Sequence, residues 1–350
     1  MSAPVKVAVV GASGYSGAEL LRLLLRHPNA ELVAVTSRSL AGKPLSKEFP
    51  RFRGVGVADS LTFTAPDAQD LKDAGAEIAF LALPHGVSAE YAVPLLKLGL
   101  KVIDLSADFR LRSPAVYEEF YGHAHPAPEL LEEAVYALPE VRADGIKSAR
   151  LIACPGCYPT SILLPLIPLL KAGLLSDAPL SVSSMSGATG AGRKESIPLL
   201  FCEVQNSVRS YSVPSHRHLS EIGQELALAA GRDEVKLTFV PHLVPTFSGI
   251  CTTTFAQLKP RATVADVRTA LHAAYDHQPF VRLLGENQSP DTKNVTGTNF
   301  IDIGWAYDAR AGQLILMSVE DNIGKGASGQ AVQNMNLICG FEATAGLLNI

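Results

Sequence analysis

The feature that most constrains the fold is a glycine-rich turn near the N-terminus. Residues 5–10 form an apolar run typical of a buried strand, and residues 18–26 have the pattern of a helix. Between them the glycines have the spacing Gly11-x-x-Gly14-x-x-Gly17. Such a turn lets the backbone approach a pyrophosphate, whose charge the helix N-terminus stabilises. A plain strand-to-helix turn is the alternative. The predicted contacts to a dinucleotide are Gly11, Ser13, Gly14, Tyr15 and Ser16.

The end of the second strand indicates which dinucleotide binds. Residues 32–36 form another apolar strand, and Ser37, Arg38 and Ser39 follow it. An NAD enzyme usually carries Asp or Glu here to bind the ribose 2′-hydroxyl, whereas an arginine suits a 2′-phosphate. We therefore predict NADP(H), held through Ser37 and Arg38. The alternative is that Arg38 is a solvated surface charge.

Two further strands predict the rest of this cleft. Residues 78–83 end at Pro84, and residues 102–105 end at the stretch Ser-Ala-Asp-Phe-Arg, residues 106–110. In an open parallel sheet, ligands bind beyond the carboxyl ends of the strands. We therefore expect residues 84–86, which are Pro-His-Gly, and residues 106–110 to line the cleft. Arg110 binds an anionic substrate or pairs with nearby carboxylates.

A second strand-to-helix turn carries the candidate nucleophile. Residues 151–153 indicate a buried strand, Pro-Gly at 155–156 indicates a turn, and a helix is expected from Ser161. Cys157 would then lie near the first backbone N–H groups of that helix, which favour a thiolate over a thiol. A thiolate in a cleft attacks carbonyl carbons. The alternative is that Cys157 is a small buried hydrophobic residue.

Cys154 and Cys157 form a C-x-x-C pair, which is compatible with a redox dithiol or half of a zinc site. The chain has no second C-x-x-C. His216 and His218 form an H-x-H pair that does not match common zinc spacings. We therefore predict no metal.

From about residue 180 strands follow one another with fewer helices between them, which favours a mixed or antiparallel sheet. The predicted strands are residues 182–186, 236–240, 250–255, 300–305 and 314–319. A helix is expected at 264–275.

Polar loops in this half are candidate binding elements. A loop that contains Gly187, Gly190 and Arg193 can present backbone N–H groups to a phosphate or nicotinamide, with a flexible linker as the alternative. His216 and His218 flank Arg217, and we expect Ser215 or His216 near a helix N-cap.

A final helix, residues 330–337, is expected to cross back onto the first domain beside the cofactor. It carries Asn334, the last predicted cofactor contact.

Composition excludes several classes of protein. The chain has 350 residues, enough for about two domains, and a net charge of −4, which argues against nucleic-acid binding. No apolar run is long enough to span a bilayer, and the N-terminus has no secretory apolar region. Five cysteines at unrelated spacings fit a reducing compartment. We therefore predict a cytoplasmic protein with no membrane and no nucleic-acid partner.

Several of these motifs together resemble the N-acetyl-γ-glutamyl-phosphate reductases of arginine biosynthesis, in the semialdehyde dehydrogenase superfamily. They are the glycine turn, residues 104–111, Pro-Gly-Cys-Tyr-Pro-Thr at 155–160, residues 186–193, His-Arg-His at 216–218, residues 241–245 and residues 325–336. The resemblance implies an α/β protein with a Rossmann-type parallel-sheet domain that binds NADP, at residues 1–152 and 327–350. It also implies an α+β catalytic and oligomerisation domain with a mixed sheet, at 153–326, and a homodimer or homotetramer.

The resemblance further implies roles for single residues. Cys157 is the nucleophile that attacks an acyl phosphate, and His216 is the acid/base, with His218 as second choice. Candidates for the substrate phosphate or carboxylate are Arg110, Arg193, Arg217 and His218. The chain departs from the family pattern at Ser248, where an arginine is expected, and at Cys154, which would make Cys157 prone to oxidation. Rival readings are a reductase of aspartyl or carrier-linked aminoadipyl phosphate, and a non-catalytic NADP-binding redox sensor.

Overall fold

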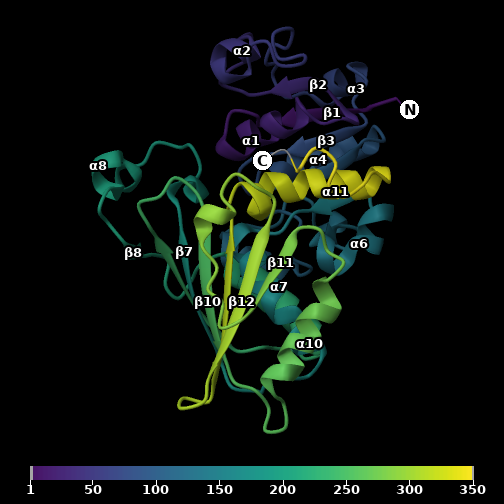
Figure 1. The fold of residues 1–350 in the computed structure, drawn as a ribbon. Helices are drawn as coiled ribbons and strands as arrows, with labels where there is room; N and C mark the ends of the chain where they lie inside the picture. The colour runs from purple at the N-terminus through teal and green to yellow at the C-terminus, as the bar shows by residue number, and fades with distance from the viewer. Residues whose placement is uncertain (1–2, 349–350) are drawn as a thin grey trace. The chain divides into compact units, whose positions relative to one another are not determined.

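The computed structural model describes residues 3–348, and the chain divides into two compact units. The first unit contains residues 1–156 and 327–350, and the second contains residues 157–326. Figure 1 shows the elements of each unit. Among residues 3–348 no helix is both long enough and apolar enough to cross a membrane.

The first unit is built on a six-stranded sheet in which every strand pair is parallel, as predicted. The strand order is β2-β1-β3-β4-β6-β5. The strands are β1 Val5–Val10, β2 Ala30–Thr36, β3 Ile78–Leu81, β4 Lys101–Asp104, β5 Val135–Tyr136 and β6 Leu151–Ala153. The interior of the sheet is fully apolar in β3, where all four residues are buried, because helices cover both faces of such a sheet.

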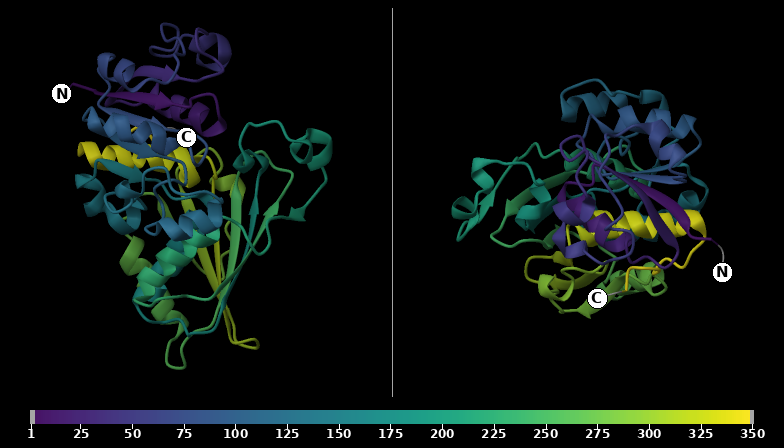
Figure 2. Two further views of the ribbon diagram at one scale, coloured as in Figure 1. Left: turned by 180° about the vertical axis from the view of Figure 1, so that it is seen from behind. Right: turned by 90° about the horizontal axis from the view of Figure 1, so that it is seen from above.

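Helices connect these strands. They are α1 Tyr15–Leu24, α2 Leu45–Glu48, α3 Ala68–Asp73, α4 Ser88–Lys97, α5 Pro114–Tyr121 and α6 Pro139–Ser148. The last helix of the chain, α11 Gly329–Cys339, also belongs to this unit and packs against α1, α6 and β4. It is the yellow helix beside the N-terminal elements in both views of Figure 2. The predicted return of this helix to the first domain is therefore confirmed.

The strand order places a topological switch point between β1 and β3. The chain leaves β1 toward β2 on one side of it, and later returns to add β3 on its other side. In doubly wound sheets the ligand crevice lies at the carboxyl ends of the strands at such a point. The glycine turn follows β1 and Pro84 follows β3, so both predicted loops flank the crevice.

The second unit is built on a seven-stranded mixed sheet, with the order β11-β12-β13-β10-β7-β9-β8. The strands are β7 Leu180–Ser186, β8 Arg209–Ser210, β9 Leu237–Leu243, β10 Ile250–Ala256, β11 Val281–Glu286, β12 Ile301–Asp308 and β13 Gln313–Glu320. The β7–β9 and β11–β12 pairs are parallel and the other pairs are antiparallel. The predicted mixed sheet is confirmed, whereas the sequence pattern missed β8 and β11.

One face of this sheet carries the helix α7 Cys157–Lys171, which packs on β10 and β13 and against α9 His218–Ala230 and α10 Val264–Tyr275. The remaining helix is the short α8 Phe201–Val204. On the other face, side chains such as Met185 and Phe255 are exposed. Burial therefore alternates along β7 and β10, as expected for a sheet covered on one side.

Two predicted helix starts were wrong and a third was confirmed. α1 begins at Tyr15, because the extended backbone of Gly14 starts the helix earlier than the apolar pattern does. α7 begins at Cys157 and not at Ser161. α9 begins at His218 with Arg217 as its N-cap, so His216 lies beside the N-cap as expected. In α7 a proline occupies the third helical position, which the first turn tolerates because its N–H has no partner there.

Candidate active site

The glycine turn of the first unit is shaped for close approach. Gly11 has φ of +85°, and a Cβ there would lie 2.5 Å from the carbonyl oxygen of Ala82, just beyond β3. A Cβ on Gly17 would lie 2.6 Å from Cα of Ala12, so this glycine lets α1 pack on the turn. Gly14 has open space around its Cβ position. It is the N-cap residue of α1 and has no side chain that could cap the helix. The N-terminus of α1 is thus suited to an anionic group.

Hydroxyl groups and one guanidinium gather at the end of β2. The Ser37 side chain is buried, and its Oγ donates to Oγ of Ser13 in the glycine turn at 3.2 Å. Ser39 Oγ lies 3.3 Å from Ser37 Oγ. Arg38 is exposed, and its Nη2 donates to the Tyr91 hydroxyl at 2.7 Å. This strand end therefore has hydroxyls and a cation where an NAD enzyme would have a carboxylate.

Residues 106–110, which follow β4, are hydrogen-bonded to the loop that follows β3. Gly86 N and Ala89 N donate to the two carboxylate oxygens of Asp108, at 2.6 and 3.1 Å. The Ser106 hydroxyl donates to Asp104 and accepts from Asp108 N. Asp108 therefore holds the loop after Pro84 at the N-terminus of α4, and Pro84 itself stays exposed at the crevice. The prediction that the whole 106–110 stretch lines the cleft was wrong, because Asp108 and Arg110 are buried.

Arg110 lies inside the first unit. Its Nε donates to the carbonyl oxygen of Cys154 at 2.7 Å, and its Nη2 donates to that of Leu105 at 2.9 Å. Both bonds go to backbone carbonyl oxygens, whereas the sequence suggested a substrate anion or a nearby carboxylate. The guanidinium instead fixes the chain just before the Pro155–Gly156 turn, three residues ahead of Cys157.

Cys154 is fully buried, and this burial raises the pKa of its thiol to about 12. Asn334 of α11 lies beside it, with Nδ2 at 3.8 Å from Sγ. The same Nδ2 donates to the carbonyl oxygen of Ala137 at 3.1 Å. A thiol with so high a pKa is a poor partner for thiol–disulfide exchange, which weakens the redox-sensor reading. Both Cys154 and Cys157 are free thiols.

Cys157 is half-buried and is the first residue of α7. The positive end of the helix macrodipole therefore acts directly on its side chain. Gly326 packs against it so closely that a Cβ on this glycine would lie 2.7 Å from Cβ of Cys157. The nucleophile candidate is thus held between a helix start and a glycine loop.

A cluster of aromatic rings surrounds the next residue, Tyr158. Its ring makes edge contacts with His216 and His218, whose centroids lie 5.5 and 5.9 Å away. Its hydroxyl lies 2.9 Å from the hydroxyl of Tyr211. Phe239 of β9 closes the cluster, against both Tyr158 and His216. Because Cys157 and Tyr158 are adjacent, the cluster brings both histidines to the start of α7.

His216 is held in its neutral form by its surroundings. Burial, followed by the charge of the adjacent Arg217, lowers the pKa of its imidazole to about 4. The ring is therefore neutral at pH 7 and ready to accept a proton. Its Nδ1 accepts a hydrogen bond from His218 N at 3.2 Å, which fixes the ring at the start of α9.

The glycine loop 187–192 is anchored through its own N–H groups. Gly187, Ala188 and Thr189 donate to the carbonyl oxygens of Gly249, Thr246 and Phe247. Gly190 N and Gly192 N donate within the loop. The prediction that Gly187 and Gly190 present N–H groups to a ligand was therefore wrong. What they offer is close approach: a Cβ on Gly187 would lie 2.8 Å from Cα of Ser248.

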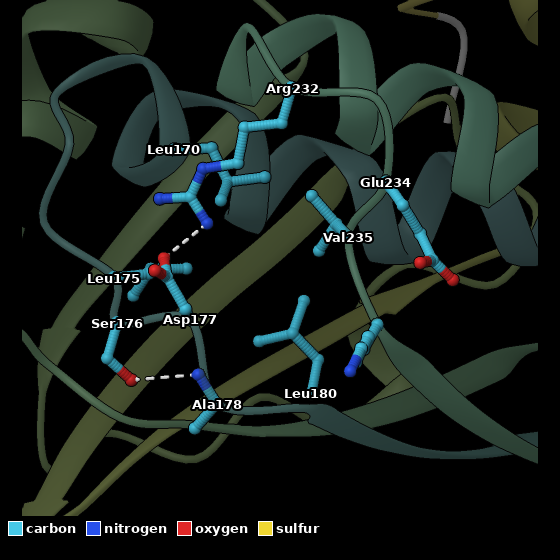
Figure 3. A pocket seen from close by; sticks show the side chains of 10 residues that line it. Leu170, Leu175, Ser176, Asp177, Ala178, Leu180, Arg232, Glu234 and Val235 are labelled. Carbon is cyan, nitrogen blue, oxygen red and sulfur yellow. Dashed lines mark hydrogen bonds and ion pairs between the residues drawn. The ribbon is translucent and has the colours of Figure 1, made fainter.

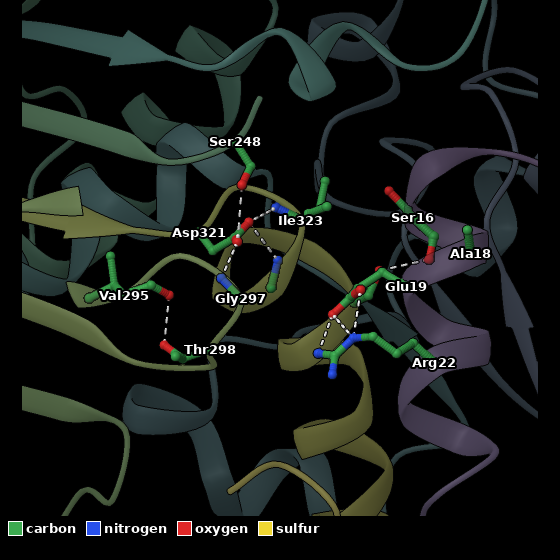
Figure 4. A network of polar contacts seen from close by, with 12 residues as sticks. Ser16, Ala18, Glu19, Arg22, Ser248, Val295, Gly297, Thr298, Asp321 and Ile323 are labelled. Atoms are coloured by element: carbon green, nitrogen blue, oxygen red, sulfur yellow. Dashed lines mark hydrogen bonds and ion pairs between the residues drawn. The ribbon is translucent and has the colours of Figure 1, made fainter. Parts of the chain in front are cut away.

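Asp321 and Asn322, which follow β13, hold this part of the second unit together. Figure 4 shows Asp321 accepting from Gly297 N at 2.6 Å and from the Ser248 hydroxyl at 3.3 Å. Asn322 accepts from Gly249 N at 2.8 Å and donates to Thr189 Oγ1 at 2.9 Å. Ser248 thus stands against a buried carboxylate. Arg193 and Arg217 lie on the surface of the same unit.

A separate hollow of about 270 Å³ lies at the other end of α7, where Arg232 pairs with Asp177 at 2.5 Å (Figure 3). Leu170, which lines it, is thirteen residues beyond Cys157, or about 20 Å along a helix. This hollow is therefore remote from the thiol. Among residues 3–348 no group of three or more His, Cys, Asp or Glu is arranged to hold a metal.

Comparison with known proteins matches both units to one family. Residues 6–149 match the model described as "Semialdehyde dehydrogenase, NAD binding domain", and residues 157–322 match "Semialdehyde dehydrogenase, dimerisation domain". The N-acetyl-gamma-glutamyl-phosphate reductase of Akkermansia muciniphila is 59% identical over 343 residues, which are 98% of each chain. This chain belongs to the N-acetyl-γ-glutamyl-phosphate reductase family. The Nitrosococcus oceani member is 46% identical, over 99% of this chain and 98% of its own.

Solved structures extend the fold of this reductase family to more distant relatives. Aspartate semialdehyde dehydrogenase II of Vibrio cholerae has a TM-score of 0.73 at 17% identity, over 97% of this chain and 99% of its own. The Candida albicans aspartate semialdehyde dehydrogenase, solved with NADP, has a TM-score of 0.71 at 16% identity, over 96% and 99%. At these identities the likeness concerns the fold. The predicted combination of a parallel-sheet domain and a mixed-sheet domain is confirmed.

The NAD-binding unit of this reductase family member fits a dinucleotide. The glycines after β1 leave room that side chains would fill. The N-cap residue of α1 is Gly14, which makes no side-chain hydrogen bond to the helix start. Within the described chain, the buried Oδ1 of Asn334 has no hydrogen-bond partner, so it is available to accept one from a bound group.

Sequence reasoning about this reductase missed Tyr211, Asp321, Asn322 and Gly326. Asp-Asn directly after a strand and before Gly-x-Gly was a usable signal, because both residues favour loops in which their side chains bind backbone N–H groups. Tyr211 carried no local signal, since its partner Tyr158 is 53 residues away.

Proposed function

We propose that this chain reduces N-acetyl-L-glutamyl 5-phosphate to N-acetyl-L-glutamate 5-semialdehyde with NADPH, the reductive step of arginine biosynthesis. Relatives of that name, 46–59% identical along their full length, support it. The observation that carries it is the start of α7, where Cys157 precedes a tyrosine packed against two histidines. That constellation suits acyl transfer to sulfur.

Cys157 and His216 carry the covalent chemistry in this proposal. Neutral His216 takes the thiol proton, and the Cys157 sulfur attacks the acyl carbon, which forms the C–S bond of a thioester as the C–O bond to phosphate breaks. Bound NADPH would supply a hydride to the thioester carbon. The protonated His216 stabilises the oxygen that becomes negative, and the C–S bond then breaks to release the aldehyde and the thiolate. The thiolate takes the proton back from His216, which restores the starting state. His218 is the alternative proton carrier.

The first unit, with residues 1–152 and 327–350, is proposed to hold NADP(H). The predicted contacts Gly11, Ser13, Gly14, Tyr15 and Ser16 would surround the pyrophosphate. Ser37 and Arg38 would bind the 2′-phosphate, since the strand end has hydroxyls and a cation. Pro84 and Asn334 complete the set in this unit. Gly187 and Gly190, which belong to the second unit, stay predicted cofactor contacts.

Substrate anions are assigned to the exposed cations of the second unit. Arg193 lies in the glycine loop, and Arg217 stands between the two histidines, so either suits a phosphate or a carboxylate. For Arg110 we propose a structural role in place of substrate binding. Its two hydrogen bonds to carbonyl oxygens support a role in holding the chain before Cys157.

The second unit, predicted as residues 153–326, is proposed to assemble a homodimer or homotetramer. Its family model is a dimerisation domain. Ile197 and Phe201 are 74% and 75% exposed, and Leu200 and Val208 are also exposed. We call residues 195–213, which extend from the sheet around α8 in Figure 1, the arm. Large exposed apolar groups on one segment are typical of a protein interface. A cytoplasmic location stays a prediction.

Turnover in the reverse direction tests the proposal. Wild type and Cys157→Ser are given N-acetyl-glutamate semialdehyde, phosphate and NADP, and NADPH formation is followed by absorbance. Cys157→Ser is expected to lose activity, whereas Cys202→Ser, which changes an exposed thiol in α8, keeps it. Near-wild-type turnover by Cys157→Ser would remove the thiol from the mechanism. Higher kcat/KM with aspartate semialdehyde would instead identify a rival substrate.

A further inference from the structure

The Tyr91 side chain is anchored beside the end of β2. It belongs to the first turn of α4, whose start is held by the hydrogen bond from Ala89 N to Asp108. The ring is half-buried and packs against the apolar core of the first unit, as do Val33 and Ala34 of β2. The Tyr91 hydroxyl is therefore presented from a rigid support.

This hydroxyl occupies one edge of the Arg38 guanidinium. It accepts hydrogen bonds from Nε at 3.2 Å and from Nη2 at 2.7 Å, and Cζ of Arg38 lies 5.7 Å from the centroid of the Tyr91 ring. A guanidinium has a second edge, formed by Nη1 and Nη2, that can donate two parallel N–H groups to a phosphate. Arg38 Nη1 makes no hydrogen bond to any of residues 3–348, and 68% of the side chain is exposed. The second edge is therefore accessible to a ligand.

The neighbouring carboxylate is a weaker partner of this guanidinium. Glu90 Oε2 lies 3.9 Å from Arg38 Nη2, and both side chains are mostly exposed. An ion pair of this kind contributes little in water. Fixing a long arginine side chain costs conformational entropy, which phosphate binding would otherwise have to offset. The Tyr91 hydroxyl is the group that fixes the guanidinium before any ligand binds.

Hydroxyl groups lie on both sides of Arg38 in the chain. Ser37 Oγ is 3.3 Å from Ser39 Oγ and 3.2 Å from Ser13 Oγ in the glycine turn. These hydroxyls and the open guanidinium edge form the donor set that a phosphate prefers. The hydrogen bond to Tyr91 raises the pKa of the Arg38 guanidinium, so the cation persists at every pH at which the protein is folded.

We propose that Tyr91 is a positioning residue that determines the preference for NADPH over NADH. Its hydroxyl holds one edge of the Arg38 guanidinium and leaves the other edge for the 2′-phosphate of NADPH. Tyr91 acts through Arg38 and does not itself bind the cofactor. NADH has a 2′-hydroxyl in place of the phosphate, so its binding does not depend on this pair. The inference rests on the proposed function in taking the end of β2 as the 2′-phosphate site.

Fluorescence titration of the full chain with each cofactor tests this inference. Tyr91→Phe keeps the ring and removes the hydroxyl. The Kd for NADPH should rise about three- to tenfold, because the guanidinium loses an exposed charge-assisted hydrogen bond, and the Kd for NADH should stay within about twofold. Adenosine 2′,5′-bisphosphate, which has the 2′-phosphate but no nicotinamide, should weaken as NADPH does. Tyr307→Phe changes an exposed tyrosine of β12 and is the control, for which all three constants should be unchanged.

A double variant separates this role from a structural one. In a chain that already carries Arg38→Ala, Tyr91→Phe should have no further effect on NADPH binding, because the hydroxyl acts through the guanidinium. An additional loss there, an unchanged Kd for NADPH in Tyr91→Phe alone, or an equal rise for NADH would each overturn the inference. Weaker NADPH binding in Glu90→Gln than in Tyr91→Phe would assign the holding role to the carboxylate and would also overturn it.

Failure of the inference and failure of the proposed function give different results. If Arg38→Ala loses the preference for NADPH and Tyr91→Phe keeps it, the inference alone is refuted. If both variants lose the preference but the wild type does not reduce N-acetyl-L-glutamyl 5-phosphate, the proposed reaction is refuted and the inference stands.

Discussion

The hydroxyl oxygens of Tyr158 and Tyr211 lie 2.9 Å apart. Burial raises the pKa of both phenols, that of Tyr211 to about 12, and the charge of Cys157 adds to the effect. Two protonated hydroxyls therefore stay near the sulfur at every physiological pH. The same Tyr158 ring holds His216, so the acid/base candidate and the nucleophile share one rigid support.

The proton-accepting role of His216 predicts a pH profile. Because its pKa is lowered to about 4, the neutral form persists from neutral pH down to about pH 5. We expect kcat/KM to show no histidine limb between pH 6 and 8 and to fall as the pH drops through about 4. His216→Asn should lower kcat about 10²- to 10⁴-fold. A limb near pH 6.5 in the wild type that His216→Asn removes would contradict the assignment.

The same shift predicts a stability effect. A histidine whose folded pKa lies below its unfolded value of 6.5 contributes stability that is present above pH 6.5 and is lost as the pH falls toward 4. The free energy of unfolding, measured with urea, should therefore fall less steeply over this range in His216→Asn than in the wild type.

Asp104 predicts the opposite trend. Burial, followed by the charge of Asp108, raises the pKa of Asp104 to about 7. The folded protein thus binds a proton that the unfolded chain releases near pH 4, and this stability is lost as the pH rises from about 4 to 7. Asp104→Asn should flatten that decline, by an amount on the order of 2–4 kcal/mol. Urea unfolding at pH 5 and pH 8 measures it, and equal declines in both proteins would refute it.

Gly326→Ala should damage the second unit. Its Cβ would come within 2.7 Å of Cys157 and 3.0 Å of Glu320. We expect a loss of about 1–3 kcal/mol in unfolding free energy and a lower kcat, because the thiol is displaced. Gly223→Ala is the control, since this glycine of α9 has nothing within 4 Å of its Cβ position. That control should be neutral or slightly stabilising. Equal behaviour of the two variants would disprove the close packing.

Arg38→Ala should weaken the binding of NADPH much more than the binding of NADH. If the guanidinium binds the 2′-phosphate, the variant loses one charge-assisted contact to NADPH. The Kd for NADPH should then rise about tenfold or more, whereas the Kd for NADH should hardly change. Arg53→Ala, another exposed arginine of the first unit, is the control. Titration of the cofactor by fluorescence gives both constants. An equal change for NADH and NADPH would place Arg38 away from the 2′-position.

The arm predicts the assembly state. Phe201→Glu and Ile197→Glu put charges where apolar groups are exposed, so a homo-oligomer that buries them should dissociate into smaller species. Light scattering on a sizing column measures the mass. Leu228→Glu changes an exposed leucine outside the arm and should leave the mass unchanged. An unaltered mass in both arm variants would remove the arm from the interface.

The regular parts of this fold were predictable from the sequence because they depend on local patterns. β1 and α10 begin and end at the predicted residues, and α10 has a capping box at Thr263 and Asp266. The start of α7 was not predictable in this way, since a Pro-Gly turn and a proline at the third position conceal a helix that begins at Cys157.

The candidate site was predictable where one residue type implies a chemistry, as for Cys157 and His216. It was not predictable where function depends on partners distant in sequence. Arg110 looked like an anion ligand, yet its guanidinium donates to two carbonyl oxygens, one of them 44 residues away. The N–H groups of Gly187 and Gly190 looked available, yet backbone carbonyls accept them.

The packing of Gly326 on Cys157 has a consequence for the path of the chain. The polypeptide passes from one unit to the other twice, after Gly156 and after Gly326. Since Gly326 touches Cys157, both crossings leave the second unit at a single spot. The second unit therefore begins and ends at the nucleophile candidate, so a change in the path of either connecting segment would reach the sulfur first.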